Sequence, residues 1–339
     1  MRRGSMLRNL VALTIAGFGV MAPALPSSAA ALVHVWVDDL HDTSPQFIGS
    51  AEGEPMAYDS ALHTAMLVNA RFNSQRSAIS SVWTSAGAGW SRVGVTPGTG
   101  PCPAGQCSGG FKIAYDALHR VMVGVGNCAY SVNDLCTWTW AGGPSWTLVS
   151  SSGFTNVDEV ALAYDPALSG TVLVAESLNG FTTNPPVTYL WNGSTWAVVA
   201  NGPSQGPVVS GGAMAYDTAH REIVFHVQIL SSTQTWVLRG TTWVRLFPTT
   251  EAPTVFAALA SDPAEGLVVL TTPGDAETWT WDGTTWQQAI APQSNTVPVL
   301  VGVGNIGICA ITYDTTRHAV IGLDDTGVLD LTAVFRPLL

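Results

Sequence analysis

The sequence predicts an all-β fold, a six-bladed β-propeller with four antiparallel strands per blade, and three observations support this prediction. A small apolar run ending in Tyr-Asp, or Ser-Asp in the fifth copy, recurs at spacings of 57, 49, 52, 45 and 52 residues. Periods of this size indicate a solenoid, a propeller or an array. A β-branched run follows each copy, and a pair of tryptophans flanking a short turn closes each of the first five periods. The copies end at Asp59, Asp116, Asp165, Asp217, Asp262 and Asp314.

The clearest tryptophan pair lies in residues 279–286, which read Trp-Thr-Trp-Asp-Gly-Thr-Thr-Trp. An Asp-Gly pair between strand-like runs predicts a tight type I′ hairpin turn, because that turn needs φ > 0 at both central residues. Residues 191–196 repeat the pattern with Asn192-Gly193. Each period thus holds the Tyr-Asp strand (strand a), the β-branched strand (strand b) and the two hairpin strands (strands c and d). Four antiparallel strands make one propeller blade.

The sixth period lacks a fourth strand. Its strands are expected at residues 311–313, 319–323 and 328–334, and no tryptophan follows them. Residues 32–37 are strand-like, and Trp36 lies 22 residues before Tyr58, inside the range of 18 to 27 that separates each hairpin tryptophan from the next repeat. We therefore expect the N-terminal strand to close the sixth blade, which removes an exposed sheet edge.

Residues 1–31 are predicted to be a secretory signal peptide. Arg2, Arg3 and Arg8 precede an apolar stretch that is too short to span a bilayer, and small residues lead up to Ala31. A membrane anchor is the alternative, but no stop-transfer pattern follows. The sequence therefore predicts export to an extracellular or periplasmic compartment without membrane insertion. Residues 32–339 are then expected to form one propeller domain.

The charge balance narrows the classes of partner. The net charge is −11, and Lys112 is the only lysine. Removal of the three leader arginines leaves ten basic and 24 acidic side chains, a net charge of −14. Such a chain is not expected to bind nucleic acid. We expect an extracellular protein or glycan partner, a monomeric chain and no bound cofactor. The alternative is bound Ca²⁺, whose preference for oxygen ligands suits carboxylates and carbonyl groups of the loops.

The five cysteines suggest a disulfide framework, because export favours disulfides. Cys102 and Cys107 are close in sequence, as are Cys128 and Cys136. We predict these two pairings, with Cys309 buried and free. Cross-pairing between the two loops and a zinc–thiolate site remain alternatives.

The alternation of Ala-Tyr-Asp, a β-branched strand and Trp-x-Trp-Asp-Gly-x-x-Trp resembles degenerate bacterial kelch-type repeats of the galactose-oxidase central-domain class. The resemblance covers essentially all of the chain after the leader, and it implies a propeller. Kelch strands b usually end in a Gly-Gly doublet, to which only Gly124-Val125-Gly126 comes close here. The copper ligands and crosslinked tyrosine of galactose oxidase match no motif, so the resemblance implies no copper site.

Most repeated residues are expected to serve the fold. The repeated Asp should accept hydrogen bonds from backbone N–H groups in the turn between strands a and b, rather than form a ring of cation ligands. The hairpin tryptophans should pack between adjacent blades rather than stack on sugars. The histidines of these turns belong to different blades and are not expected to share a metal ion. They are His63, His119, His220 and His318.

In a propeller the a–b and c–d turns share one face, here called the turn face. The b–c loops and d–a crossovers share the other, the long-loop face. Because its connections are long and irregular, the long-loop face is the expected binding face. No nucleophile elbow, phosphate loop or arginine triad appears, so the sequence favours a binding or scaffold module over an enzyme.

The alternative function is a carbohydrate-active enzyme, a hydrolase or lyase with paired carboxylates at the channel mouth. No catalytic or metal-binding residue is predicted outright. The candidate ligand-binding residues are the non-repeated polar side chains expected on the long-loop face. They are Arg71, Asn73, Arg76, Asp158, Glu159, Glu176, Asp275, Glu277, Asp324 and Asp325.

Overall fold

The computed structural model describes fourteen segments, and every structural statement below concerns these residues alone. They are residues 34–38, 55–72, 78–85, 90–93, 111–127, 134–155, 157–177, 186–203, 208–229, 232–253, 257–272, 277–290, 308–324 and 332–337. The chain divides into two units, Met1–Leu32 and Val33–Leu339, and the described segments all belong to the second. Nowhere in these segments does a helix have the length and apolar character that a membrane crossing requires.

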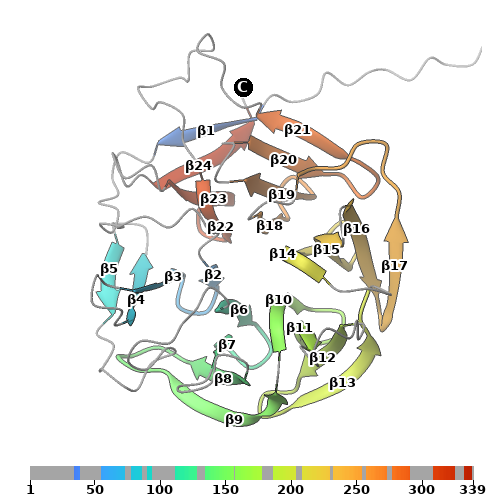
Figure 1. Ribbon diagram of the computed structural model, residues 1–339. Helices are drawn as coiled ribbons and strands as arrows, with labels where there is room; N and C mark the ends of the chain where they lie inside the picture. The colour runs from blue at the N-terminus through green and yellow to red at the C-terminus, as the bar shows by residue number, and fades with distance from the viewer. Residues whose placement is uncertain are drawn as a thin grey trace, which may run out of the picture. The chain divides into compact units, whose positions relative to one another are not determined.

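The described strands form six antiparallel sheets of four, which confirms the predicted six-bladed propeller (Figure 1). Blade 1 holds β2 (Met56–Asp59), β3 (Thr64–Phe72), β4 (Ala78–Ser85) and β5 (Trp90–Val93). Blade 2 holds β6 (Lys112–Asp116), β7 (Val121–Asn127), β8 (Asp134–Trp140) and β9 (Thr147–Thr155). Blade 3 holds β10 (Val157–Asp165), β11 (Gly170–Ser177), β12 (Val187–Trp191) and β13 (Trp196–Asn201).

The remaining blades follow the same order of strands. Blade 4 holds β14 (Val208–Asp217), β15 (Glu222–Ile229), β16 (Ser232–Arg239) and β17 (Thr242–Leu246). Blade 5 holds β18 (Ala258–Asp262), β19 (Leu267–Thr272), β20 (Glu277–Trp281) and β21 (Trp286–Ile290). Blade 6 holds β22 (Ile308–Asp314), β23 (Ala319–Asp324), β24 (Thr332–Pro337) and β1 (His34–Asp38).

Blade 6 is closed by the N-terminal strand, as predicted. Strand β1 pairs antiparallel with β24, and Trp36 lies opposite Phe335. Strand β24 covers residues 332–337 rather than the expected 328–334, so the prediction placed it a few residues early. Because β1 comes from the other end of the chain, strand pairing replaces the covalent hairpin that links strands c and d in the other blades.

The six innermost strands form a closed cycle in which β2, β6, β10, β14, β18 and β22 each contact the next, and β22 contacts β2. Where these strands converge, the repeated alanine is buried in five blades, because a larger side chain would crowd its neighbours. The five are Ala57, Ala114, Ala163, Ala215 and Ala260.

Tryptophans join adjacent blades, which confirms their predicted packing role. Trp191, Trp281 and Trp286 are among the largest fully buried side chains. Among the described contacts, the indole N–H of strand d donates to a threonine hydroxyl on strand c of the preceding blade in four cases. The donor–acceptor pairs are Trp36 with Thr278 (2.9 Å), Trp196 with Thr137 (2.8 Å), Trp243 with Thr188 (2.8 Å) and Trp286 with Thr235 (2.8 Å).

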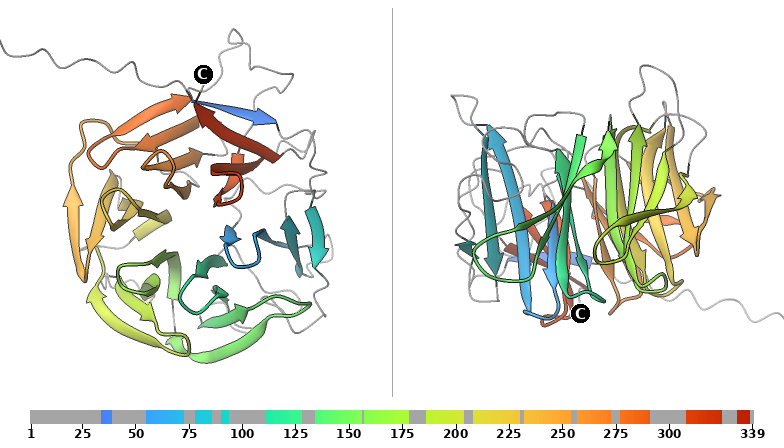
Figure 2. Two further views of the ribbon diagram at one scale, coloured as in Figure 1. Left: turned by 180° about the vertical axis from the view of Figure 1, so that it is seen from behind. Right: turned by 90° about the horizontal axis from the view of Figure 1, so that it is seen from below.

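The repeated aspartates close the a–b turns, as predicted; these turns face the viewer in Figure 2 (left). Asp217 Oδ1, for example, accepts hydrogen bonds from the N–H groups of Ala219 and His220, both at 3.0 Å. Equivalent bonds occur in the other turns, and every repeated Asp is buried. The acceptors are Asp59, Asp116, Asp165, Asp262 and Asp314.

Each a–b turn also has a residue in the left-handed region four positions after its Asp. Only Gly266, with φ of 67°, suits that conformation without strain. The other five turns hold a residue with a side chain there, at φ between 51° and 60°. They are His63, Arg120, Ser169, Arg221 and His318.

The prediction of a type I′ turn at Asp282-Gly283 is wrong. Trp281 pairs with Trp286, so four residues connect the two strands. Gly283 has φ of 91°, whereas Asp282 is not among the residues with positive φ. The Asp282 side chain closes the loop, because its Oδ1 accepts from the N–H groups of Thr284 (2.8 Å) and Thr285 (2.9 Å). Hydrogen bonds to the Asp282 carboxylate therefore stabilise this four-residue loop, and it needs only one left-handed residue, Gly283.

The cysteine pairings stay predictions. Cys136 is buried in β8 and disulfide-bonded. Cys102, Cys107 and Cys128 also lie outside them. Cys309 belongs to β22.

Candidate functional site: the axial cavity and the long-loop face

A cavity of about 80 Å³ lies between the six inner strands, on the long-loop side of the repeated Tyr-Asp residues. It adjoins the first residues of β2, β6 and β18 and the middle of β10, β14 and β22. Every blade contributes to its wall. The lining residues are Pro55 and Met56 of blade 1, Lys112 and Ile113 of blade 2, Ala161 and Leu162 of blade 3, Gly212, Ala213 and Met214 of blade 4, Ala257, Ala258 and Leu259 of blade 5, and Ile311 of blade 6.

Most side chains that line this cavity are apolar. Among the described residues that line it, Lys112 alone is charged, and it is also the only lysine of the chain. The volume suits a few water molecules and is well below the roughly 300–1,000 Å³ of ordinary ligand pockets. A glycan or peptide would therefore have to lie across the surrounding long-loop face rather than inside the ring.

Three inner strands are irregular close to this cavity. The pairing register shifts in β10 between Val157 and Val160, and in β22 between Ile308 and Ala310. It shifts twice in β14 between residues 208 and 213. Such bulges leave an extra residue unpaired and bend the strand, and they are common beside functional sites. The long-loop end of the ring is thus less regular than the turn end.

Three predicted acidic residues occupy facing backbone positions at the bulge in blade 3. Asp158 and Glu159 lie between Val157, which pairs with Ser177, and Val160, which pairs with Ala175. They are therefore opposite Glu176 on β11. The sequence placed these residues before strand a and after strand b, which is wrong, because both strands run on past the hydrophobic run that marks them.

Three other candidates also lie in strands rather than in the expected b–c loops. Arg71 belongs to β3, Asp324 ends β23 and Glu277 begins β20. Glu277 has a structural partner, because its Oε2 accepts a hydrogen bond from Trp279 Nε1 at 2.8 Å. Gln234 accepts from Trp236 in the same way in blade 4, at 3.0 Å. The candidates outside the described residues are Asn73, Arg76, Asp275 and Asp325.

Sequence reasoning missed two features of this end of the ring. One is Lys112, which lines the cavity. The sequence signal for it was that the only lysine of the chain stands at the start of an inner strand. The other is a buried network around His226 and Glu251. Burial lowers the pKa of His226 to about 4 and raises the pKa of Glu251. The only sequence signal was that His226 occupies a strand-b position where Val125 and Val174 stand in blades 2 and 3.

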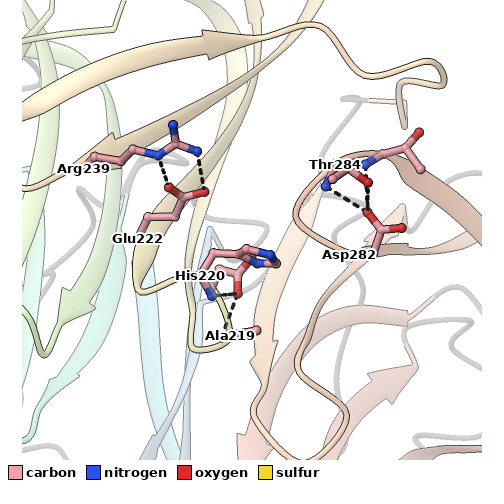
Figure 3. Close-up of polar contacts among 8 residues, drawn as sticks. Ala219, His220, Glu222, Arg239, Asp282 and Thr284 are labelled. Carbon is pink, nitrogen blue, oxygen red and sulfur yellow. Dashed lines mark hydrogen bonds and ion pairs between the residues drawn. The ribbon is translucent and has the colours of Figure 1, made fainter.

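The turn face has a different chemistry, which Figure 3 illustrates at the junction of blades 4 and 5. His220 Nδ1 lies 2.9 Å from Asp217 Oδ2, and a Cβ at Gly283 of the next blade would collide with the His220 ring. His119 is placed in the same way, between Asp116 and Gly193. These histidines fill gaps between blades, and no group of three or more potential metal ligands occurs among the described residues.

Comparison with known proteins supports the fold alone. No protein-family model matches the sequence, and no curated protein matches it. The chain is similar to the solved structure of the SapL1 lectin in complex with alpha methyl fucoside (TM-score 0.54, 13% identity, 83% of this chain and 91% of the lectin). It is also similar to a Trypanosoma rangeli sialidase in complex with the inhibitor DANA (TM-score 0.53, 11% identity, 89% of this chain and 59% of the sialidase).

A third similar structure is an auxiliary nutrient binding protein from Bacteroides thetaiotaomicron (TM-score 0.52, 9% identity, 84% of this chain and 69% of that protein). All three identities are low, so these similarities show a shared propeller and no family. The kelch-type resemblance of the repeats likewise extends only to the propeller.

Proposed function

We propose that this protein is an exported binding module that takes a neutral glycan on its long-loop face. The observation that carries the proposal is the contrast between the two ends of the ring. Each repeated turn described on the turn face binds its own backbone amides, whereas the opposite end combines the axial cavity with three bulged inner strands. Irregular connections on a rigid scaffold are where binding residues usually lie.

The charge pattern favours a neutral ligand. The long-loop candidates are mostly acidic, and the whole chain has a net charge of −11. Acidic polysaccharides would be repelled except near Arg71 and Arg76. A binding role is also supported by two similar structures, a lectin with a bound fucoside and a nutrient binding protein. Export remains part of this proposal, since residues 1–31 lie outside the described residues.

A glycan array probed with the chain lacking residues 1–31 tests this function. We expect binding to one class of neutral glycan and weaker or no binding to sulfated and sialylated glycans. A parallel activity screen on polysaccharides separates binding from catalysis, because a binding module leaves them intact. Turnover of any polysaccharide, or binding confined to polyanions, would overturn the proposal. N-terminal sequencing of the exported protein tests cleavage near Ala31.

A further inference from the structure

A buried polar network joins blade 4, blade 5 and the crossover between them. His226 on β15 and Thr235 on β16 lie directly opposite each other in the sheet, and both are fully buried. Glu251 lies in the crossover after β17, with 30% of its side chain exposed. Trp286 begins β21 of blade 5 and packs its ring against His226, with ring centroids 4.9 Å apart.

The distances define which atoms donate. Trp286 Nε1 donates to Thr235 Oγ1 at 2.8 Å. The same oxygen lies 2.8 Å from Glu251 Oε2 and 3.2 Å from His226 Nδ1. On the other side of the ring, His226 Nε2 lies 3.0 Å from the carbonyl oxygen of Ala252. Because a carbonyl oxygen only accepts, Nε2 holds the proton of the neutral imidazole and Nδ1 is an acceptor.

The network is one proton short when Glu251 is ionised. The Thr235 hydroxyl has a single hydrogen, which both His226 Nδ1 and the Glu251 carboxylate require. Whichever acceptor loses it is left without a donor from this hydroxyl, and for buried Nδ1 that is unfavourable. A proton on Glu251 resolves the conflict. The carboxyl O–H then donates to Thr235 Oγ1, Thr235 donates to His226 Nδ1, and the indole N–H still uses the second lone pair of Oγ1.

We propose that His226, Thr235 and Glu251 form a proton-binding latch, which takes up one proton as the pH falls from neutral and then ties the crossover to blades 4 and 5. The crossover ends at Ala257, which lines the axial cavity, so the latch lies on the path between the outer strand and that cavity. The inference is independent of the proposed glycan, because it concerns proton uptake by the folded chain itself.

The burial of His226 and the charges around Glu251 indicate where the proton resides. Burial lowers the pKa of His226 to about 4, so the imidazole stays neutral while burial raises the pKa of Glu251. Among the described residues, the charged or titratable groups that face Glu251 are His226, with Nδ1 4.0 Å from Oε2, and Arg245 of β17, whose charge acts to lower the pKa of Glu251. Glu251 is therefore the group that titrates.

Blades 2 and 3 contain the same indole–threonine hydrogen bond, but no histidine competes there for the threonine hydroxyl hydrogen. Val125 faces Thr137 in blade 2, and Val174 faces Thr188 in blade 3, where blade 4 has His226 facing Thr235. The Thr188 hydroxyl donates to the carbonyl oxygen of Asn201 at 3.3 Å. The variant His226→Val thus restores the arrangement of two neighbouring blades and removes the competing acceptor.

The sign of the pH effect follows from the raised proton affinity of folded Glu251. Stability from this proton is fully present below the unfolded pKa of glutamic acid and is lost as the pH rises through the folded value. Glu251→Gln imitates the protonated state at every pH, because its amide N–H donates to Thr235 Oγ1. Glu265→Gln is a matched control, since Glu265 is exposed in the a–b turn of blade 5.

The test is denaturant unfolding of the chain lacking residues 1–31 between about pH 5 and about pH 8. We expect the folding equilibrium constant of the wild type to fall relative to Glu251→Gln as the pH rises, by up to about tenfold per pH unit. Glu265→Gln should follow the wild type, and in the His226→Val background the effect of Glu251→Gln should lose most of its pH dependence. Parallel curves for wild type and Glu251→Gln would overturn the latch.

Nitrogen NMR of His226 provides a second test that needs no His226 variant. We expect Nε2 to remain protonated across the pH range, and the Nδ1 resonance to shift as Glu251 titrates. In Glu251→Gln the Nδ1 resonance should keep its low-pH position at every pH. A second proton on the imidazole within that range, or an Nδ1 resonance that never shifts, would contradict the assignment.

Discussion

The two faces of the ring are built on different principles, although the same strands end on both. On the turn face one device repeats in all six blades: a buried Asp binds two or more groups of its own turn, and a left-handed residue follows four positions later. On the long-loop face the described blades differ from one another. Three have bulged inner strands, and blade 4 has the network of His226. Repetition marks the part that holds the ring together, and irregularity marks the part that is free to acquire a ligand.

The repeated tyrosines strengthen this view of the turn face. Tyr58 O–H and Thr316 Oγ1 of blade 6 lie 2.7 Å apart. Burial, followed by the charge of Asp59 in the preceding blade, raises the pKa of Tyr115. Tyrosine thus bridges neighbouring turns, except in blade 5, where Ser261 takes its place and its buried hydroxyl has no hydrogen-bond partner among the described residues. The repeated side chains of the turn face therefore contact neighbouring blades, which is a structural role.

The largest predicted difference between the faces comes from removing one turn carboxylate. Asp217→Ala leaves the N–H groups of Ala219 and His220 and the His220 ring without their acceptor. We expect a loss of about 2–4 kcal/mol in unfolding free energy, measured by urea denaturation. Asp158→Ala on the long-loop face is the control, with an expected change within about 0.5 kcal/mol. Equal losses in the two variants would erase the distinction between the faces.

Substitutions of glycines in the hairpin turns should cause a smaller loss of stability, and two such turns can be compared with each other. Gly283→Ala combines left-handed backbone strain with a collision with His220, and we expect a loss of about 2 kcal/mol. Gly240→Ala has only the strain, because no atom lies within 4 Å of the added Cβ, so about 1 kcal/mol is expected. Adding His220→Ala to Gly283→Ala should abolish the collision. A double-mutant cycle measures this coupling, and a coupling of zero would show that His220 does not fill the gap.

The left-handed position of the a–b turns predicts a gain. Ser169→Gly relieves strain at φ of 57°, and we expect about 0.5–1 kcal/mol of added stability. Gly266→Ser, the reverse change at the equivalent position of blade 5, should lose a similar amount. Thermal unfolding of both variants measures the two shifts. If the two shifts have the same sign, the left-handed backbone that repeats in these turns does not determine how a substitution there changes the stability.

An effect of similar size is an acid sensitivity that differs between two turns. Burial acts to raise the pKa of Asp314, but Arg317 Nη1, 2.7 Å away, and two backbone N–H groups hold it below its usual value. Its stabilisation is present above the unfolded pKa and is lost as the pH falls through the lower folded value. Burial instead raises the pKa of Asp165.

Acidification toward about pH 3 should therefore destabilise the wild type relative to Asp314→Asn, by on the order of 1 kcal/mol. Relative to Asp165→Asn, the wild type should gain stability over the same fall in pH. Urea midpoints at several pH values measure both trends. Two trends of the same sign would show that Arg317 does not set the behaviour of Asp314.

The repeated parts of the fold were predictable because their causes are local. The Asp of each turn binds N–H groups two and three residues away. The strand that closes blade 6 was indicated by the missing fourth strand of the last period, the strand-like residues 32–37 and the spacing of Trp36. The type of the Asp282-Gly283 turn was predicted wrongly, because the composition of the turn does not reveal that the carboxylate itself closes a four-residue loop.

The irregular parts could not be predicted because their partners are distant in sequence. His226, Thr235, Glu251 and Trp286 come from two strands of one blade, a crossover and the next blade, and no spacing rule joins them. The bulge that gathers Asp158 and Glu159 opposite Glu176 interrupts the two-residue alternation on which strand prediction depends. The candidate site was therefore predicted as a face of the ring and not as an arrangement of residues.

Paired substitutions on the two faces, measured against a glycan identified on the array, test the central claim most directly. Asp324→Ala with Asp325→Ala, on the long-loop face, should weaken binding at least about tenfold, or 1.4 kcal/mol, with an unchanged fold by circular dichroism. His119→Ala and Asp282→Ala, on the turn face, should leave the affinity of the folded protein unchanged. If only the turn-face substitutions abolish binding in a folded protein, the ligand binds the opposite face and the account is wrong.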